Sequence, residues 1–139
     1  MKKEKSVASV VSTHILTTSI VIPFFGLLAA YYASKFLGTS VSQGLMMIIK
    51  DIIYISFFII GVKYSLSYID KKIAITNPQD CSKYSIITFA IIMIFMLIID
   101  ILAAPTVIGI IYNLLFFGII FAIFFIFTKN YFEKFYQEV

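Results

Sequence analysis

The sequence predicts an all-α integral membrane protein: one four-helix transmembrane domain over residues 1–139, folded as two hairpins with both termini in the cytoplasm. Three observations support this prediction. Of the 139 residues, 61% are hydrophobic and only 13% are charged, whereas a soluble domain is roughly 45–50% apolar and about 25% charged. Four apolar stretches alternate with short polar segments. Most lysines lie on one side of those stretches.

This composition argues against several classes of protein. It is not the composition of a soluble enzyme, a disordered tail or a nucleic-acid-binding protein. The sequence contains no nucleophile elbow, zinc-binding helix, phosphate-binding loop or dinucleotide fingerprint, so we expect no enzymatic activity. One His and one Cys that lie far apart in the sequence are too few for a protein-only zinc or haem site, so we expect no metal and no cofactor.

The first span is predicted at about residues 8–33. From Ser6 to Ser34 the chain has no Asp, Glu or Lys, and a helix needs about 20 apolar residues to cross the hydrocarbon core. A lysine-rich start before an apolar run resembles a secretory signal peptide. The run is too long for one, and residues 29–33 make a poor cleavage site, so we expect a retained helix. Pro23 is expected to kink it.

The second span, at about residues 46–68, is the most charged. It carries Lys50 and Asp51 near one end and Lys63 near the other. A long Lys side chain can reach the interface, but the carboxylate of Asp51 is harder to accommodate. Residues 34–44 are expected to form a loop or a short interfacial piece. The sequence leaves open whether residues 34–50 are a loop or an interfacial helix.

The last two spans are predicted at about residues 84–103 and 106–128. A polar segment with a turn signal at Asn77-Pro78 precedes them. The apolar run that follows carries one charge, Asp100, and is too long for a single crossing. Pro105 divides it, because proline disfavours helix in the preceding residue and suits the first turn of a new helix. The tail at 129–138 is expected to extend the last helix along the interface.

Lysine placement predicts the orientation. With both termini inside, nine lysines lie on the cytoplasmic side and two, Lys35 and Lys50, lie outside. This bias follows the positive-inside rule. We therefore expect a multi-pass protein of a bacterial inner membrane with its N- and C-termini in the cytoplasm.

Small residues mark the expected helix contacts. Lipid is as apolar as leucine, so membrane helices associate where small residues let their backbones approach. Such residues recur at four-residue spacing in the first and fourth spans, where they are expected to contact another helix of the chain or of a partner. These candidate packing residues are Gly26, Ala29, Ala30, Ala33, Gly118 and Ala122. The alternative is that Ala and Gly are simply common in membrane spans.

Asp51 and Asp100 fall at a similar depth near the outer ends of their spans. With neighbouring polar residues they form a candidate intramembrane cluster: Lys50, Asp51, Tyr54, Asp100, Tyr112 and Asn113. One hypothesis is that the two carboxylates bind a cation or a proton in a small transporter or channel. The alternative is a Lys50–Asp100 ion pair, with Asp51 reaching the outer headgroups.

His14 is the remaining titratable group inside a span. An imidazole titrates near neutral pH, so His14 is a candidate proton relay or pH sensor. The alternative is a capping or interhelical hydrogen bond near the inner interface.

We expect an accessory or assembly subunit of a larger membrane complex, because the chain lacks a soluble domain and a complete catalytic or ligand site. Its expected partners are the lipid bilayer and a membrane protein, either a second copy or another subunit, with no nucleic acid. One alternative is a small homo-oligomeric transporter or channel that uses Asp51 and Asp100. A further alternative is a holin-like or immunity-type membrane protein.

Overall fold

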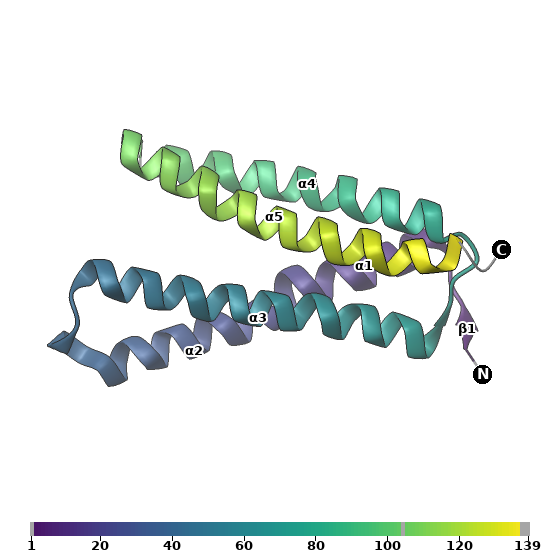
Figure 1. Ribbon diagram of the computed structural model, residues 1–139, viewed down its shortest axis with the longest axis horizontal. Helices are drawn as coiled ribbons and strands as arrows, with labels where there is room; N and C mark the ends of the chain where they lie inside the picture. The colour runs from purple at the N-terminus through teal and green to yellow at the C-terminus, as the bar shows by residue number, and fades with distance from the viewer. Residues whose placement is uncertain (1, 104, 137–139) are drawn as a thin grey trace.

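The structure is a computed structural model that describes residues 2–103 and 105–136 and consists almost entirely of helices (Figure 1). Its elements along the chain are β1 (Lys3–Glu4), α1 (Val7–Leu16), the π-helical turn η1 (Thr17–Val21), α2 (Ile22–Leu37), the 3-10 turn η2 (Gly38–Ser40), α3 (Gln43–Lys72), β2 (Ile73–Ala74), α4 (Pro78–Ala103) and α5 (Val107–Tyr136). The elements α1, η1 and α2 form one continuous helical segment.

Four helical segments of the described chain are long and apolar enough to cross a membrane. They are Val7–Leu37, Gln43–Lys72, Pro78–Ala103 and Val107–Phe135. The first three contain the predicted spans, and the fourth begins at Val107, one residue after the predicted start, so the prediction of four membrane-length helices is confirmed. The lengths and composition of these helices indicate a multi-pass membrane protein.

Each membrane-length helix begins at a polar side chain that caps its first turn. In every case a side-chain oxygen accepts the backbone N–H three residues further on, at 3.1–3.3 Å. The four capping residues are Ser6, Ser42, Asn77 and Thr106. Such caps satisfy amide groups that the first helical turn leaves without partners. The starts of the helices are therefore encoded locally.

The connection between the first two spans is shorter than predicted. The helix α2 continues to Leu37, and α3 already begins at Gln43. The expectation of a loop over residues 34–44 is therefore wrong at both ends, and Lys50 lies within a regular α-helix. The break occurs at Gly38, whose φ of +55° suits glycine, and helix resumes after the Ser42 cap. Ala104, in the predicted turn of the second connection, and tail residues 137–138 lie outside the described residues.

A π-helical turn precedes Pro23. Proline has no amide hydrogen, so Pro23 cannot donate the helical hydrogen bond to the carbonyl of Ser19, one turn earlier. The chain widens into η1 at this place, between α1 and α2. Such π-helical turns are rare, occur mostly as single turns inside α-helices, and are among the causes of helix kinks.

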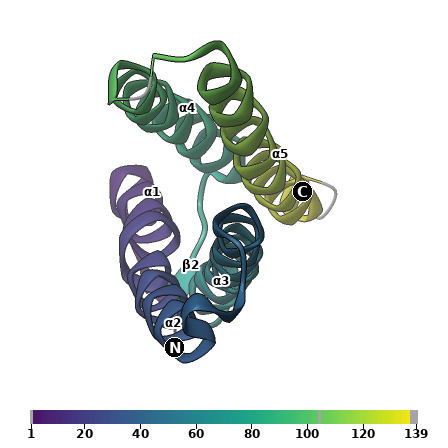
Figure 2. The same cartoon turned by 90° about the vertical axis from the view of Figure 1, so that its left-hand side faces the viewer.

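The helices are arranged as two pairs that diverge. The helix α2 lies along α3, and α4 lies along α5 (Figures 1 and 2). The pairs meet at the end that holds both chain termini, the terminal end, where α1 packs on α4. They separate toward the opposite end, the loop end, which holds η2 (Figure 1). Most of the buried core, including Val10, Ile69 and Phe132, therefore lies toward the terminal end. There β1 also pairs in parallel with β2, an association that the sequence analysis did not predict.

Candidate functional site: a cleft between the helix pairs

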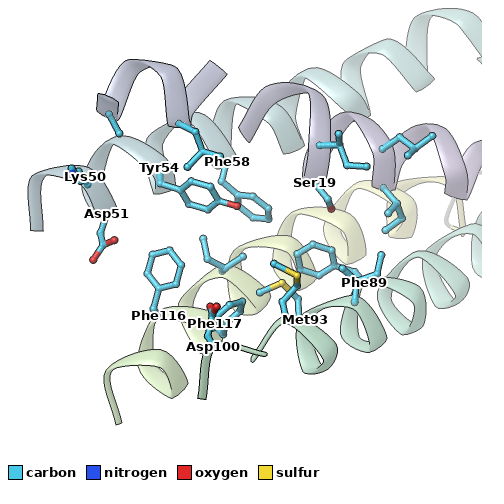
Figure 3. Close-up of a pocket in the computed structure, with 18 residues that line it drawn as sticks. Ser19, Lys50, Asp51, Tyr54, Phe58, Phe89, Met93, Asp100, Phe116 and Phe117 are labelled. Atoms are coloured by element: carbon cyan, nitrogen blue, oxygen red, sulfur yellow. The ribbon is translucent and has the colours of Figure 1, made fainter. Parts of the chain in front are cut away.

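A cleft of ≈ 700 Å³ lies between the two helix pairs (Figure 3). Residues of all five α-helices and of η1 line it. Most of the lining side chains are apolar or aromatic. The polar ones are Ser19, Lys50, Asp51, Tyr54 and Asp100. The site is therefore an apolar cleft with a few polar groups, the composition typical of binding sites for small molecules.

The helix α3 forms the more charged wall. Asp51, Tyr54 and Phe58 follow one another at three- and four-residue spacing, so they share one face of the helix, and all three line the cleft. Phe58 is buried, whereas Asp51 and Tyr54 are half-buried. The Tyr54 ring is tilted against Phe116 of α5, with 5.8 Å between ring centroids.

The helix α4 supplies the second carboxylate from the opposite helix pair. Phe89, Met93, Met96 and Asp100 lie on one face of α4, and all line the cleft. Asp100 is half-buried. Asp51 and Asp100 therefore face the same cleft from different helix pairs (Figure 3).

Among the described residues, the charged groups of the cleft have no ion-pair partner. In the described part of the molecule the only ion pair is Lys129–Glu133, at 3.7 Å on the exposed surface of α5. The Lys50–Asp100 ion pair that was predicted as an alternative is therefore not formed. Lys50 lines the cleft but is exposed.

Four of the six residues predicted as a polar cluster line the cleft. Tyr112 and Asn113 of α5 do not. Tyr112 is 38% exposed, on a part of α5 whose neighbours Ile111 and Leu114 are also exposed. By four-residue spacing, Tyr112 and Asn113 share the face of α5 that carries Phe116 and Phe117, but they lie about one turn nearer the loop end, beyond the residues that line the cleft.

Ser19 is a polar residue of the cleft that was not among the predicted site residues. Its hydroxyl oxygen is buried and has no hydrogen-bond partner among the described residues, and the side chain lines the cleft (Figure 3). Ser19 belongs to η1. The one signal for it in the sequence is its place four residues before Pro23, whose missing amide disturbs the helix at that turn.

His14 forms a second polar site, toward the terminal end. Its side chain is fully buried. One ring nitrogen, Nδ1, lies 2.8 Å from the Ser65 hydroxyl of α3, and Nε2 lies 2.9 Å from the Thr128 hydroxyl of α5. A neutral imidazole has one donor and one acceptor nitrogen, and a hydroxyl complements either one. This geometry is that of the interhelical hydrogen bond predicted as the alternative to a relay.

An aromatic stack connects His14 to the cleft. The His14 ring stacks on Phe124 at 4.9 Å, and Phe124 stacks on Phe89 at 3.9 Å. Phe89 is part of the cleft wall. His14 therefore does not line the cleft itself, because the rings of Phe124 and Phe89 lie between its imidazole and the cleft.

The candidate packing residues divide into two groups. A Cβ atom added at Gly26 would lie 2.9 Å from Phe57 Cβ, so α2 and α3 approach closely there. Ala30 is buried, and Ala29 and Ala33 are half-buried. By contrast, a Cβ atom at Gly118 would meet nothing within 4 Å, and Ala122 is exposed. Gly118 and Ala122 therefore lie on a face of α5 that does not pack within the described chain.

The described residues contain no group of three or more His, Cys, Asp or Glu side chains that could hold a metal ion. The carboxylates of Asp51 and Asp100 can instead attract a cation without enclosing it. The fold and the cleft together define a small helical protein that is suited to a membrane and has an acidic opening between two helix pairs. The chain matches no protein-family model, no curated protein and no solved structure.

Proposed function

We propose that this chain is a small membrane transporter or channel that binds a cation at Asp51 and Asp100. The supporting observation is that these carboxylates come from different helix pairs and line one cleft, without an ion-pair partner in the described chain. A charged group costs about 2.5–3.5 kcal/mol at the centre of a membrane helix on insertion scales, and a group near a helix end, where Asp51 and Asp100 lie, can be reached by water. Carboxylates of this kind characteristically face a water-filled cavity and mark an ion or substrate pathway.

In this proposal the protein lies in a bacterial inner membrane with both termini in the cytoplasm. The chain termini share one end of the molecule (Figure 1). The positive-inside rule assigns that end, which carries most of the lysines, to the cytoplasm. The cleft then opens toward the outer surface.

Ion flux through the purified chain tests this function. The full chain is reconstituted in liposomes, and proton and monovalent-cation flux is measured. Asp100→Asn keeps the side-chain shape and removes the charge, so we expect flux to fall at least about tenfold. Asp70→Asn is the matched control, because Asp70 is exposed and lies outside the cleft. Asp70 accepts a hydrogen bond from the Tyr131 hydroxyl at 3.3 Å, and the amide oxygen of Asn can accept the same bond. Unchanged flux in Asp100→Asn would contradict the proposal.

The second candidate function is an accessory or assembly subunit of a larger membrane complex. It is favoured by Gly118 and Ala122, which lie at four-residue spacing on an unpacked face of α5 and would allow a helix of a second copy or of another subunit to approach. The native mass of the same preparation separates the two functions. Larger subunits that co-purify, together with no flux from the isolated chain, would favour the accessory function.

A further inference from the structure

We infer that the cleft binds an amphipathic organic cation, with a positive head between Asp51 and Asp100 and an apolar or aromatic body deeper between the helix pairs. This inference rests on the proposed function in that it uses the same two carboxylates. It differs in naming the class of ligand. A transporter of protons or bare metal ions needs no large apolar wall around its carboxylates.

The size of the cleft is the first argument. Its volume of ≈ 700 Å³ lies within the roughly 300–1,000 Å³ typical of sites for drug-sized molecules. A metal ion would need several oxygen ligands at about 2.0–2.6 Å, whereas the described residues contain no group of three or more candidate ligands. The space therefore fits an organic molecule better than an ion.

The distribution of polarity is the second argument. Lys50 and Asp51 lie at the loop-end side of the cleft, and Phe89 lies at its opposite side (Figure 3). Asp51 and Asp100 against Lys50 leave one negative charge when all three are ionised. Between these ends the wall includes Phe58 and Met93. Such a gradient favours a ligand with one positive end and one apolar end, and aromatic faces add a further attraction for cations.

Ser19 is the third and independent argument. Its buried hydroxyl faces the cleft without a hydrogen-bond partner among the described residues. Buried polar groups in proteins are normally hydrogen-bonded, so one that is left over calls for a partner. Because this oxygen is covered, a polar atom of a ligand would reach it once the Ser19 side chain rotates toward the cleft. The hydroxyl lies on η1, apart from the carboxylates of α3 and α4.

Binding of two ions that share a shape and differ in charge tests the inference. The purified full chain in lipid nanodiscs is titrated with radiolabelled tetraphenylphosphonium, and in parallel with tetraphenylborate. Because the interfacial dipole potential makes the two ions partition differently into lipid, binding to protein-free nanodiscs of the same lipid is subtracted for each ion. We then expect saturable binding of the cation to the protein and a Kd at least about tenfold higher for the anion. This comparison uses the unmodified protein, so it remains decisive even if a variant fails to fold.

Variants then locate the site. Asp51→Asn and Asp100→Asn are expected to raise the Kd for tetraphenylphosphonium at least about tenfold, because each removes one charge at the opening. Ala30→Leu adds bulk to the wall and narrows the cleft without changing its charge, so it is also expected to weaken the binding of tetraphenylphosphonium. Asp70→Asn, outside the cleft, is the control and should leave the Kd unchanged.

The outcomes separate this inference from the proposed function. Equal affinity for the two ions, or no saturable binding, would overturn the inference, as would a co-purifying membrane protein that fills the cleft and leaves no binding. Proton or sodium flux without tetraphenylphosphonium binding would support transport and overturn the ligand class. Charge-selective binding without any flux would support the ligand class and overturn transport.

Discussion

His14 connects three helical segments through one side chain. Its ring nitrogens contact the hydroxyls of Ser65 and Thr128, and the Thr18 hydroxyl lies 3.5 Å from Nδ1. All four side chains are buried. Inside a membrane protein no water is present to form a hydrogen bond that a polar group lacks. Hydrogen bonds such as those of His14 therefore specify which faces of the helices meet. We therefore assign His14 a structural role in joining the helix pairs at the terminal end.

Removing one hydroxyl of this group tests that role. Thr128→Val preserves shape and leaves Nε2 of His14 without its partner. We expect the free energy of unfolding to fall by about 0.6 kcal/mol, the average for hydrogen bonds between membrane helices, and by no more than about 1.7 kcal/mol, the largest such value. The change is read from reversible unfolding of the purified chain in mixed micelles.

Two further variants isolate the hydrogen bond. Thr13→Val is the matched control, because the Thr13 hydroxyl donates only to the Ser9 carbonyl of its own helix, at 2.8 Å. Its effect should be at most a few tenths of a kcal/mol. In a His14→Phe background, Thr128→Val should become nearly neutral. An equal loss in both backgrounds would mean that the hydroxyl does not act through His14.

Among the helical elements, those with local signals could be predicted from the sequence. Long apolar runs and capping side chains such as Ser42 and Asn77 determine where the helices lie. The connection at residues 34–44 was predicted too long, because polar residues near a membrane surface are compatible with both loop and helix. The widened turn at η1 was not predicted, since a proline indicates a disturbance without specifying its form.

The candidate cleft could be predicted only in part. The similar depth of Asp51 and Asp100 follows from counting residues along their helices. Which way a helix turns its face depends on contacts between residues far apart in sequence. For this reason Tyr112 was selected although it does not line the cleft, and the roles of Ser19 and Phe89 were missed.

The close approach between α2 and α3 leads us to expect that Gly61 of α3 cannot be replaced without a cost in stability. A Cβ atom added at Gly61 would lie 3.0 Å from Ile22 Cβ, so Ile22 must move by a few tenths of an ångström to admit it. We expect Gly61→Ala to lower the free energy of unfolding by about 1–3 kcal/mol, the usual cost of overpacking. The unfolding of Gly61→Ala is measured side by side with that of Gly118→Ala.

Gly118→Ala is the matched control within a helix. Because open space surrounds Gly118 in the described chain, we expect a neutral effect or a gain of about 0.5–1 kcal/mol from helix propensity. A loss of stability at Gly118 would show that another chain packs on this face of α5. Equal effects of the two substitutions would contradict the close contact at Gly61.

The molecule as a whole has one closed end and one open end. Hydrogen-bonded polar groups and stacked aromatic rings join the helix pairs toward the terminal end, where His14 and Phe124 lie. Toward the loop end the pairs separate, and the cleft with its carboxylates lies between them (Figures 1 and 3). The orientation in the membrane therefore decides which compartment the carboxylates face.

Cysteine labelling tests this orientation. Cys81, the one native cysteine, is buried and is replaced by Ser. Single cysteines then replace Ser40 at the loop end or Lys2 at the terminal end, both exposed. The lysine bias predicts that a membrane-impermeant maleimide labels Ser40→Cys in intact spheroplasts and Lys2→Cys only after lysis. The reverse pattern would turn the cleft toward the cytoplasm, and a ligand would then enter from inside the cell. Labelling of both sites in intact spheroplasts would mean that the chain inserts in both directions, so that the cleft serves both compartments.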